Sequence, residues 1–327
     1  MKKFILYLIA IVLSLSIILI FVVTTNTIGS LFFVKNNANF VYHDYYNYKR
    51  QPFASNDVNI KKNGNRVSFI PSSPNNINNF FFGGSSVWGS GVSDFNTLPS
   101  LYSKKTSSRS YNYGESDFNT LQSLNLFMIS LLKNEIKGEN INIFFYNGYN
   151  NVINGCSNAN SGYATSRENY IKTLIEHRPS SFKYFFHPFK HLYRNFKNFF
   201  FGNFIDLSGV NDCTSNLKKK ELVLNSITEI WKNANQIAKS NNMNFYAILE
   251  PNIYTNTDFQ NLSEITKWRH DQIKLIYNDI KKNEYDFNFI DLSEINLEKD
   301  FFLDDIHLNE KGNQVVIEEL LEKIGKI

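Results

Sequence analysis

Apolar and polar residues alternate in two different rhythms along most of this 327-residue chain. Short runs rich in aromatic and branched residues predict buried strands at 79–84, 108–114, 140–148, 243–252 and 287–295. Longer segments between and after them carry apolar residues at helical spacing, at 117–137, 216–240, 262–283 and 309–325. Strands that alternate with helices predict a parallel sheet covered by helices on both faces. The chemistry of such a sheet gathers at the carboxyl ends of its strands.

The first of these helices has a marked apolar stripe. Leu121, Leu124, Met128, Leu131 and Leu132 fall on one side of it. We expect this side to pack against the sheet, because an amphipathic helix buries its apolar stripe.

The longest apolar run of the chain lies at the N-terminus. Residues 4–23 are 20 residues without a charge, and a helix of about 1.5 Å per residue would cross a hydrocarbon core of about 30 Å. A cleaved signal peptide has a shorter apolar region and a small-residue cleavage site, which the following TTNTIGS lacks. We therefore favour an uncleaved anchor. Lys2 and Lys3 predict a cytoplasmic N-terminus, with the rest of the chain outside the cytoplasmic membrane as a single-pass protein.

Shifts in composition divide the chain into three parts. Residues 1–30 are the predicted anchor, 31–75 are a polar lead-in with short strand-like runs, and 76–327 carry the alternating pattern. Within the last part, 152–214 is long for a connection and is predicted to be an insertion or lid. Its centre, 182–204, mixes four Lys and Arg residues with many aromatics. An amphipathic cap helix is favoured there over a surface that faces the membrane or the substrate.

The two cysteines, Cys156 and Cys213, stand near the ends of the predicted insertion. Their spacing fits neither a zinc site nor a redox pair. A disulfide between them is permitted outside the cytoplasm, and two buried thiols are equally consistent with the sequence.

Composition narrows the class of partner. The 43% of hydrophobic and 16% of aromatic residues are ample for a core. The formal net charge is only +4, and no recognition motif for nucleic acid accompanies it, so a nucleic-acid partner is not expected.

Polar and small residues gather where the predicted strands end. Gly83-Gly84-Ser85-Ser86 follows the first strand, Gly114 closes the second and Asn150 follows the third. Asp304 and His307 stand three residues apart before the last helix. Because the carboxyl ends of parallel strands meet at one edge of a sheet, we expect the first three groups to converge there.

These residue types suit acyl transfer. A serine hydroxyl becomes a nucleophile when a base takes its proton, and histidine serves as that base near neutral pH. A carboxylate on the other ring nitrogen holds one tautomer, and Asp304 can reach back to His307 for this purpose. The oxyanion that forms needs donors, which the N–H groups of Ser85 and Gly114 and the side-chain amide of Asn150 can supply.

The set resembles the SGNH, or GDSL-like, hydrolase family, which is named for its Ser, Gly, Asn and His blocks. By this resemblance Ser85 is the nucleophile in the first block, Gly114 matches the second block, and Asn150 has the oxyanion role in the third. The Asp304–His307 pair matches the last block. The resemblance covers roughly residues 78–320, interrupted by the insertion.

One position departs from the family pattern. Asn151 stands where the family usually has Asp, although the family does not use that Asp as the acid of the triad. Two neighbours of the blocks are expected to have no catalytic role. Ser86 is a second serine at the turn, and Asp305 is expected to be solvated or to cap the following helix.

The resemblance implies a three-layer α/β/α domain around a parallel, flavodoxin-like five-stranded sheet, and a serine esterase without cofactor or metal. Together with the expected location, it favours an O-acylated glycan, with O-acetyl as the candidate acyl group, of the cell envelope or of an exported polysaccharide as the substrate. Two alternatives stay open. The same triad would serve an O-acyltransferase that moves the acyl group to a glycan, and a hydrolase scaffold can also carry a non-catalytic binding protein.

Overall fold

The structure is a computed structural model that describes residues 40–43, 45–157, 211–256 and 264–325, together with Tyr7, Leu13, Ser14 and Ser16. The four ranges belong to one compact unit. The predicted span at 4–23, apart from those four residues, and the basic aromatic segment at 182–204 lie outside the described part. Among the residues that the structure describes, no helix is long and apolar enough to cross a membrane.

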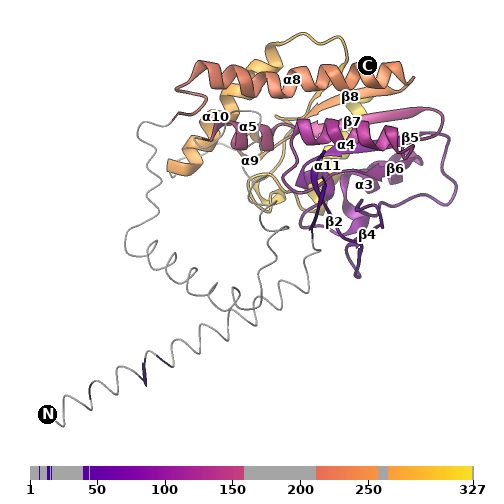
Figure 1. The fold of residues 1–327 in the computed structure, drawn as a ribbon, viewed down its shortest axis with the longest axis horizontal. Coiled ribbons are helices and arrows are strands. Elements are labelled where there is room, and N and C mark those ends of the chain that lie inside the picture. Colours follow the sequence, from indigo (N-terminus) through magenta and orange to yellow (C-terminus); the bar gives the residue numbers. More distant parts are fainter. Residues whose placement is uncertain are drawn as a thin grey trace. The chain divides into compact units, whose positions relative to one another are not determined.

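A five-stranded parallel sheet lies at the centre of this unit (Figure 1). Its strands are β5 (Asn78–Gly83), β6 (Arg109–Asn112), β7 (Ile141–Asn147), β8 (Asn244–Leu249) and β9 (Asn288–Asp291). Their spatial order is β6-β5-β7-β8-β9, which is the flavodoxin-like order with the first strand beside the second and the third. The predicted class and sheet are confirmed, and each strand overlaps the run predicted for it.

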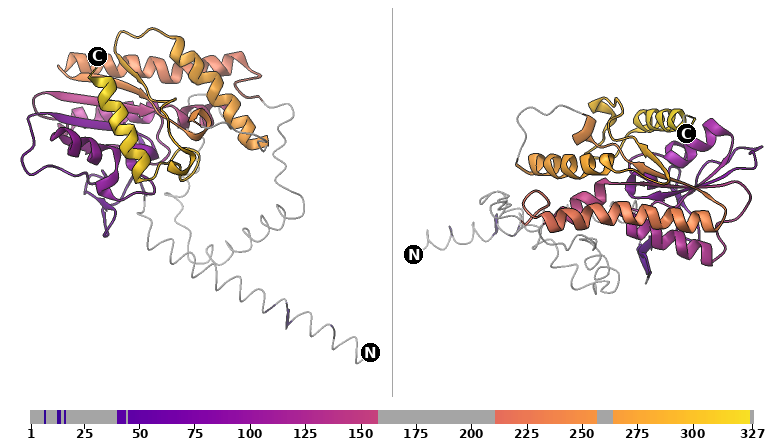
Figure 2. Two further views of the ribbon diagram at one scale, coloured as in Figure 1. Left: turned by 180° about the vertical axis from the view of Figure 1, so that it is seen from behind. Right: turned by 90° about the horizontal axis from the view of Figure 1, so that it is seen from above.

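Helices cover the sheet on both sides (Figures 1 and 2). The helices are α2 (Ser85–Trp88), α3 (Leu98–Thr106), α4 (Thr120–Leu132), α5 (Tyr149–Cys156), α8 (Leu217–Ser240), α9 (Ile253–Asn256), α10 (Glu264–Lys282) and α11 (Glu310–Ile324). Helices α3 and α11 pack together, α4 packs with α8, and α10 packs against α5, α8 and α9. Short 3₁₀ turns lie at Asp94–Asn96 and Lys299–Phe301.

Asparagine side chains start three of these helices. Asn119, Asn216 and Asn309 are the N-caps of α4, α8 and α11, and each accepts the backbone N–H three residues further on, at 3.0–3.1 Å. Such a bond satisfies one of the N–H groups that a helix start leaves without a partner in the helix. The asparagine-rich composition of the chain thus contributes directly to its helix boundaries.

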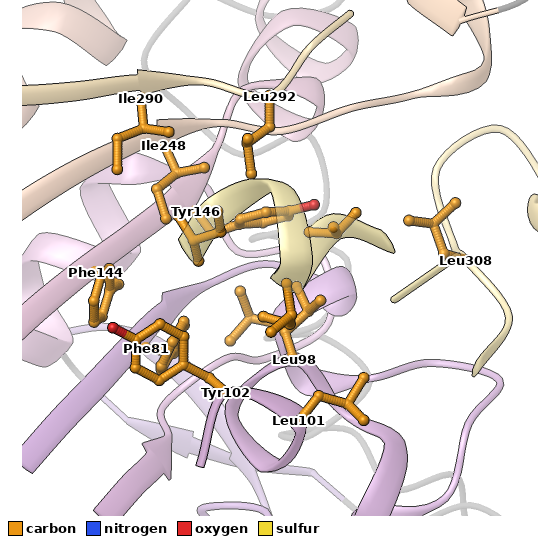
Figure 3. Close-up of a cluster of buried hydrophobic side chains, with 14 of the residues drawn as sticks. Phe81, Leu98, Leu101, Tyr102, Phe144, Tyr146, Ile248, Ile290, Leu292 and Leu308 are labelled. Carbon is orange, nitrogen blue, oxygen red and sulfur yellow. The ribbon is translucent and has the colours of Figure 1, made fainter. Parts of the chain in front are cut away.

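Aromatic side chains form a ladder across one face of the sheet. The register sets Phe81, Phe144 and Tyr246 side by side on three neighbouring strands, and their rings stack at 4.6 and 4.9 Å between centroids. Figure 3 shows the buried cluster on this face, in which the ring of Tyr102 on α3 lies 5.3 Å from the rings of both Phe81 and Phe144. Towards the starts of the strands, the same face carries Asn79, Asn142 and Asn244, whose side-chain amides hydrogen-bond across the strands at 2.9 Å. The face is therefore apolar beneath α3 and polar at its amino end.

The opposite face buries the alternate side chains. Phe82 on β5 lies 5.4 Å from Phe145 on β7 and 5.5 Å from Phe127 on α4, measured between ring centroids. Phe127 is completely buried. The predicted apolar stripe of this helix is therefore wrong in part, because Met128 is 41% and Leu132 80% exposed. Phe127 faces the sheet instead, because its ring contacts the rings of Phe82 and Phe145.

The lead-in forms two small antiparallel hairpins. Strands β1 (Phe40–His43) and β2 (Asn47–Arg50) pair with each other, as do β3 (Phe53–Ala54) and β4 (Asn59–Ile60). Its described residues belong to the same compact unit as the sheet.

Cys156, at the end of α5, and Cys213, shortly before α8, form a disulfide. The bond joins the chain on either side of residues 158–210, which lie outside the described part. Of the two alternatives that the sequence leaves open, the structure has the bonded form.

Candidate active site

Ser85 is the first residue of α2 and is separated from β5 by one residue. The strand ends at Gly83, and Gly84 is the N-cap of the short helix. The first N–H groups of a helix have no partner within it. The turn therefore presents both the hydroxyl and the N–H of Ser85 at the carboxyl edge of the sheet.

His307 reaches this serine from the loop before α11. The loop is closed by the Leu303 N–H, which donates to the His307 carbonyl at 2.7 Å, and by a bridge between Phe302 and Leu308. Nε2 of His307 lies 2.6 Å from Oγ of Ser85. The fold thus brings together two side chains that are 222 residues apart in the sequence.

Asp304 holds the imidazole from its other side. Its Oδ2 lies 2.6 Å from Nδ1 of His307, while Oδ1 accepts the backbone N–H groups of Ile306 and His307 at 3.0 and 2.9 Å. Burial opposes the ionisation of Asp304, but the bonds from the His307 side chain and from the two N–H groups outweigh it and lower the pKa to about 2. The carboxylate is therefore ionised at neutral pH. With Nδ1–H donated to it, Nε2 is left to accept the serine proton.

Asn150, the second residue of α5, lies beside the nucleophile turn. Its Nδ2 donates to the Phe118 carbonyl at 3.0 Å, which leaves the second N–H of the amide for another acceptor. A Cβ on Gly84 would lie 2.5 Å from this Nδ2. Glycine at 84 therefore lets the Asn150 amide approach the backbone just before Ser85.

Gly114 lies in the loop after β6, directly against α2. A Cβ there would lie 2.5 Å from the Trp88 nitrogen, so a larger residue would push this loop away from the nucleophile helix. The Gly114 N–H itself donates to Oδ1 of Asn112 at 3.0 Å. Of the three donors expected for an oxyanion, the Gly114 N–H is therefore already engaged by Asn112.

Two residues beside the blocks have structural partners. Asn151 accepts the Thr120 N–H at 3.2 Å and donates to the Thr120 hydroxyl at 2.8 Å, which ties α5 to the start of α4. Asp305 pairs with Arg269 of α10 and accepts from the Tyr149 hydroxyl at 3.1 Å. Asp305 does not cap the following helix, whose N-cap is Asn309, but its side chain stays 32% exposed and thus partly solvated beside these two partners.

The sequence did not indicate that the lead-in supports the nucleophile helix. Arg66, which is 1% exposed, donates to the carbonyls of Trp88, Gly89 and Val92 at 2.6–2.9 Å and pairs with Asp94 at 2.7 Å. It thereby satisfies carbonyl groups at the C-terminal end of α2 that the helix leaves open. A lone arginine in a polar segment carries no signal that identifies such distant partners.

A second lead-in arginine supports the loop that holds Gly114. The Arg50 guanidinium pairs with Glu115 at 2.9 Å, and Glu115 is completely buried. The same guanidinium lies 3.7 Å from the centre of the Trp88 ring, a cation–π contact with the last residue of α2. The lead-in therefore contacts both the nucleophile helix and the neighbouring glycine loop.

The arrangement supplies the parts of a serine nucleophile. Hydrogen bonds join Ser85 Oγ to the His307 ring and the His307 ring to the Asp304 carboxylate, which is the series that lets the histidine take the serine proton while the carboxylate stays ionised. Within the described ranges, no three His, Cys, Asp or Glu side chains lie together in a way that could hold a metal ion.

No known family profile and no curated protein sequence matches this chain. Among solved structures, it is similar to a putative lipolytic protein of the G-D-S-L family from Desulfitobacterium hafniense, with 10% identity, a TM-score of 0.41, and coverage of 76% of this chain and 99% of the other. It is also similar to a member of the lipolytic G-D-S-L family from Veillonella parvula, with 13% identity and a TM-score of 0.40. This match covers 77% of this chain and 100% of the other. A third similar structure is the acetylxylan esterase Axe2 from Geobacillus stearothermophilus, with 10% identity and a TM-score of 0.39. This match covers 78% of this chain and 97% of the other. At such low identities and TM-scores, the assignment of chemistry rests on the side chains of this chain.

Proposed function

We propose that this chain is a serine esterase of the SGNH type, which hydrolyses an acyl ester. The observation that supports this most strongly is the continuous hydrogen-bond series from Ser85 Oγ through the His307 ring to Asp304, with 2.6 Å at both steps. A serine, a histidine and a carboxylate in this order are the parts that activate a hydroxyl for attack on a carbonyl carbon.

In the first half of the proposed reaction, Ser85 Oγ attacks the carbonyl carbon of the ester while His307 Nε2 takes its proton. The negative charge moves to the carbonyl oxygen, where the Ser85 N–H and the Asn150 amide stabilise it. When the tetrahedral intermediate collapses, the C–O bond to the alcohol breaks. The leaving alcohol takes the proton from Nε2, and the acyl group stays on Ser85.

In the second half, water replaces the alcohol. His307 Nε2 takes a proton from the water as its oxygen attacks the acyl carbon, and the same donors hold the second oxyanion. The bond to Ser85 Oγ then breaks, Oγ regains the proton from Nε2, and the carboxylic acid leaves. Asp304 remains ionised throughout and stabilises the imidazolium in both halves, in keeping with its low pKa.

We propose further that the catalytic unit acts outside the cytoplasm on an uncleaved N-terminal anchor. The uncharged run at 4–23 behind Lys2 and Lys3 supports an anchor with its N-terminus inside. The Cys156–Cys213 disulfide supports an oxidising compartment, where such bonds persist. In that location the proposed substrate is an O-acyl, and most simply O-acetyl, ester on a glycan of the cell envelope or of an exported polysaccharide.

Hydrolysis of 4-nitrophenyl acetate by the wild type and by Ser85→Ala tests the chemistry. Loss of the nucleophile is expected to lower kcat by at least about 10³-fold. Ser240→Ala is the matched control, because this hydroxyl lies exposed at the end of α8 and bonds only locally to the Gln236 carbonyl. Equal turnover by wild type and Ser85→Ala would contradict the proposal.

A second assay separates hydrolysis from transfer. The protein is given an acetylated donor together with an unacetylated glycan, and free acetate and O-acetylated glycan are both measured. Acetate as the main product supports the esterase. Acetylated glycan as the main product would identify the O-acyltransferase instead, with the same triad.

A further inference from the structure

One buried carboxyl at the carboxyl end of the sheet has no part in the proposed reaction. Glu250 follows β8 directly and is 3% exposed. Burying a carboxyl group away from water is costly unless it is hydrogen-bonded, and a buried charge needs a partner of opposite sign. The groups that interact with Glu250 are uncharged hydrogen-bond donors and the phenols of Tyr146 and Tyr277.

The hydrogen bonds of Glu250 reach a residue next to Ser85 and a residue next to Asn150. Its Oε1 accepts the Tyr149 N–H at 2.9 Å, and Tyr149 directly precedes Asn150. The hydroxyl of Ser86, the residue after the nucleophile, also hydrogen-bonds to this carboxyl group. Ser86 thus has a partner that its place in the sequence does not indicate. One side chain connects the start of α2 with the start of α5.

The main chain of Glu250 is held as firmly as its side chain. Its N–H donates to the Asn147 carbonyl on β7 at 3.2 Å, and its carbonyl accepts the Tyr277 hydroxyl of α10 at 3.2 Å. These bonds fix the carboxyl group between two strand ends and one helix. A residue held in this way can set the distance between the two helices that it connects.

Burial decides the charge of this carboxyl group. Burial raises the pKa of Glu250 to about 8, against the opposing effect of the bonds from Tyr149 and Ser86. The phenols that face it, Tyr146 on β7 and Tyr277 on α10, have pKa values well above the usual range because of burial. They therefore stay neutral while Glu250 titrates, and at neutral pH Glu250 is mainly protonated.

We propose that Glu250 is a positioning residue, whose neutral carboxyl group holds the nucleophile helix and the Asn150 helix together, and whose ionisation opposes the oxyanion that these helices stabilise. The proposal rests on the esterase function proposed above. In the neutral form, the carboxyl group accepts the Tyr149 N–H and keeps the Asn150 amide beside Ser85. In the ionised form, it adds a negative charge behind the same donors, where a further negative charge develops in the transition state.

The experiment compares the wild type with Glu250→Gln, Glu250→Ala and a control, Glu318→Gln. Glu318 pairs with Lys105 at 2.8 Å on the surface, where its side chain is 58% exposed. For each protein, kcat/KM for 4-nitrophenyl acetate and the rate of labelling by a fluorophosphonate are measured from about pH 6 to about pH 9.5. Labelling reports the reactivity of Ser85 without requiring turnover.

The neutral amide of Glu250→Gln can accept the Tyr149 N–H as the acid does. This variant is expected to keep most of the wild-type kcat/KM at neutral pH. In the wild type, kcat/KM should fall by about tenfold as Glu250 ionises at alkaline pH, and in Glu250→Gln this fall should be absent. Glu250→Ala leaves the Tyr149 N–H without its acceptor and should be about tenfold slower at every pH. Glu318→Gln should follow the wild type. The same alkaline decline in wild type and Glu250→Gln would overturn the proposal, as would full activity of Glu250→Ala.

Unfolding measured against pH provides a readout that does not depend on activity. An acid whose pKa is raised in the folded state from 4.5 to about 8 destabilises the fold progressively as pH rises through that window. The wild type should therefore lose stability over this window relative to Glu250→Gln. If neither wild type nor variant hydrolyses the ester or reacts with the probe, the proposed esterase function fails, and this comparison alone decides the protonation of Glu250. Parallel stability curves would then overturn the assignment.

Discussion

The close approach of Gly84 and Asn150 allows a sharp test of the oxyanion donor. The substitution Gly84→Ala adds a Cβ that would lie 2.5 Å from Nδ2 of Asn150 and 3.2 Å from the Phe118 carbonyl oxygen. Gly84 has φ −81° and ψ −156°, which alanine adopts without strain. The substitution therefore acts through the contact with Asn150 and not through the backbone conformation.

The structure sets the size of the expected displacement. Ordinary contact with a Cβ begins at 3.4 Å, so the Asn150 amide must move by the difference from 2.5 Å, about 0.9 Å. The amide is the end of a side chain and can move at small cost in stability, about 1 kcal/mol for its weakened bond to Phe118. Loss of one oxyanion donor costs about 10²–10³-fold in kcat. A large loss of activity with little loss of stability is therefore expected.

The assay measures kcat for 4-nitrophenyl acetate and the free energy of unfolding in urea for Gly84→Ala. Gly325→Ala is the matched control, since Gly325 ends α11 and a Cβ there meets no atom closer than 3.5 Å. The control should keep the wild-type kcat. A wild-type kcat in Gly84→Ala would refute the role given to Asn150. A loss of stability as large as the loss of activation free energy would show that the substitution acts through folding instead.

Three further substitutions test the parts that support the site. Cys156→Ser opens a disulfide with a sequence separation of 57, and urea unfolding should show a loss of about 4 kcal/mol; an unchanged midpoint would contradict this. Arg66→Met leaves the buried Asp94 without its cation and should cost about 3–5 kcal/mol, whereas a loss below about 1 kcal/mol would show that Asp94 is satisfied by other groups. Asp304→Asn places an amide where His307 now finds a carboxylate, and kcat should fall by about 10³–10⁴-fold with little change in Tm; activity close to wild type would remove Asp304 from the triad.

The strands and the site residues were accessible from the sequence because both depend on local patterns. A run such as Asn79 to Gly84 shows a buried strand and its end, and in a parallel sheet strand ends share one edge. That rule alone brings Ser85 and Asn150 together. The Asp304–His307 spacing is also local, and the structure has the corresponding bond.

The inner face of α4 could not be read from leucine spacing. The periodicity of Leu121, Met128 and Leu132 is real, but these side chains are at least 36% exposed. Phe127 on the same helix faces the sheet instead, because its ring contacts Phe82 and Phe145 there. Which side of a helix is buried depends on the shape of the surface that receives it, and a single helix sequence does not contain that information.

The residues behind the site depend on contacts between distant segments. Arg66 meets Trp88 and Asp94, and Glu250 meets Tyr149, 101 residues earlier. A single charged residue after an apolar run indicates that something is unusual, but it does not name its partner. These contacts became visible only when the sheet had placed β5, β7 and β8 side by side.

The central claim is that Ser85 is a nucleophile activated by His307, and mapping the site of a fluorophosphonate adduct tests it most directly. The wild-type protein is labelled and digested, and the modified peptide is sequenced by mass spectrometry. The adduct is expected on Ser85, with no labelling in Ser85→Ala and labelling slowed by about 10³-fold or more in His307→Ala. An adduct on Ser86 or on another serine, or labelling of Ser85 at the same rate without His307, would contradict the account.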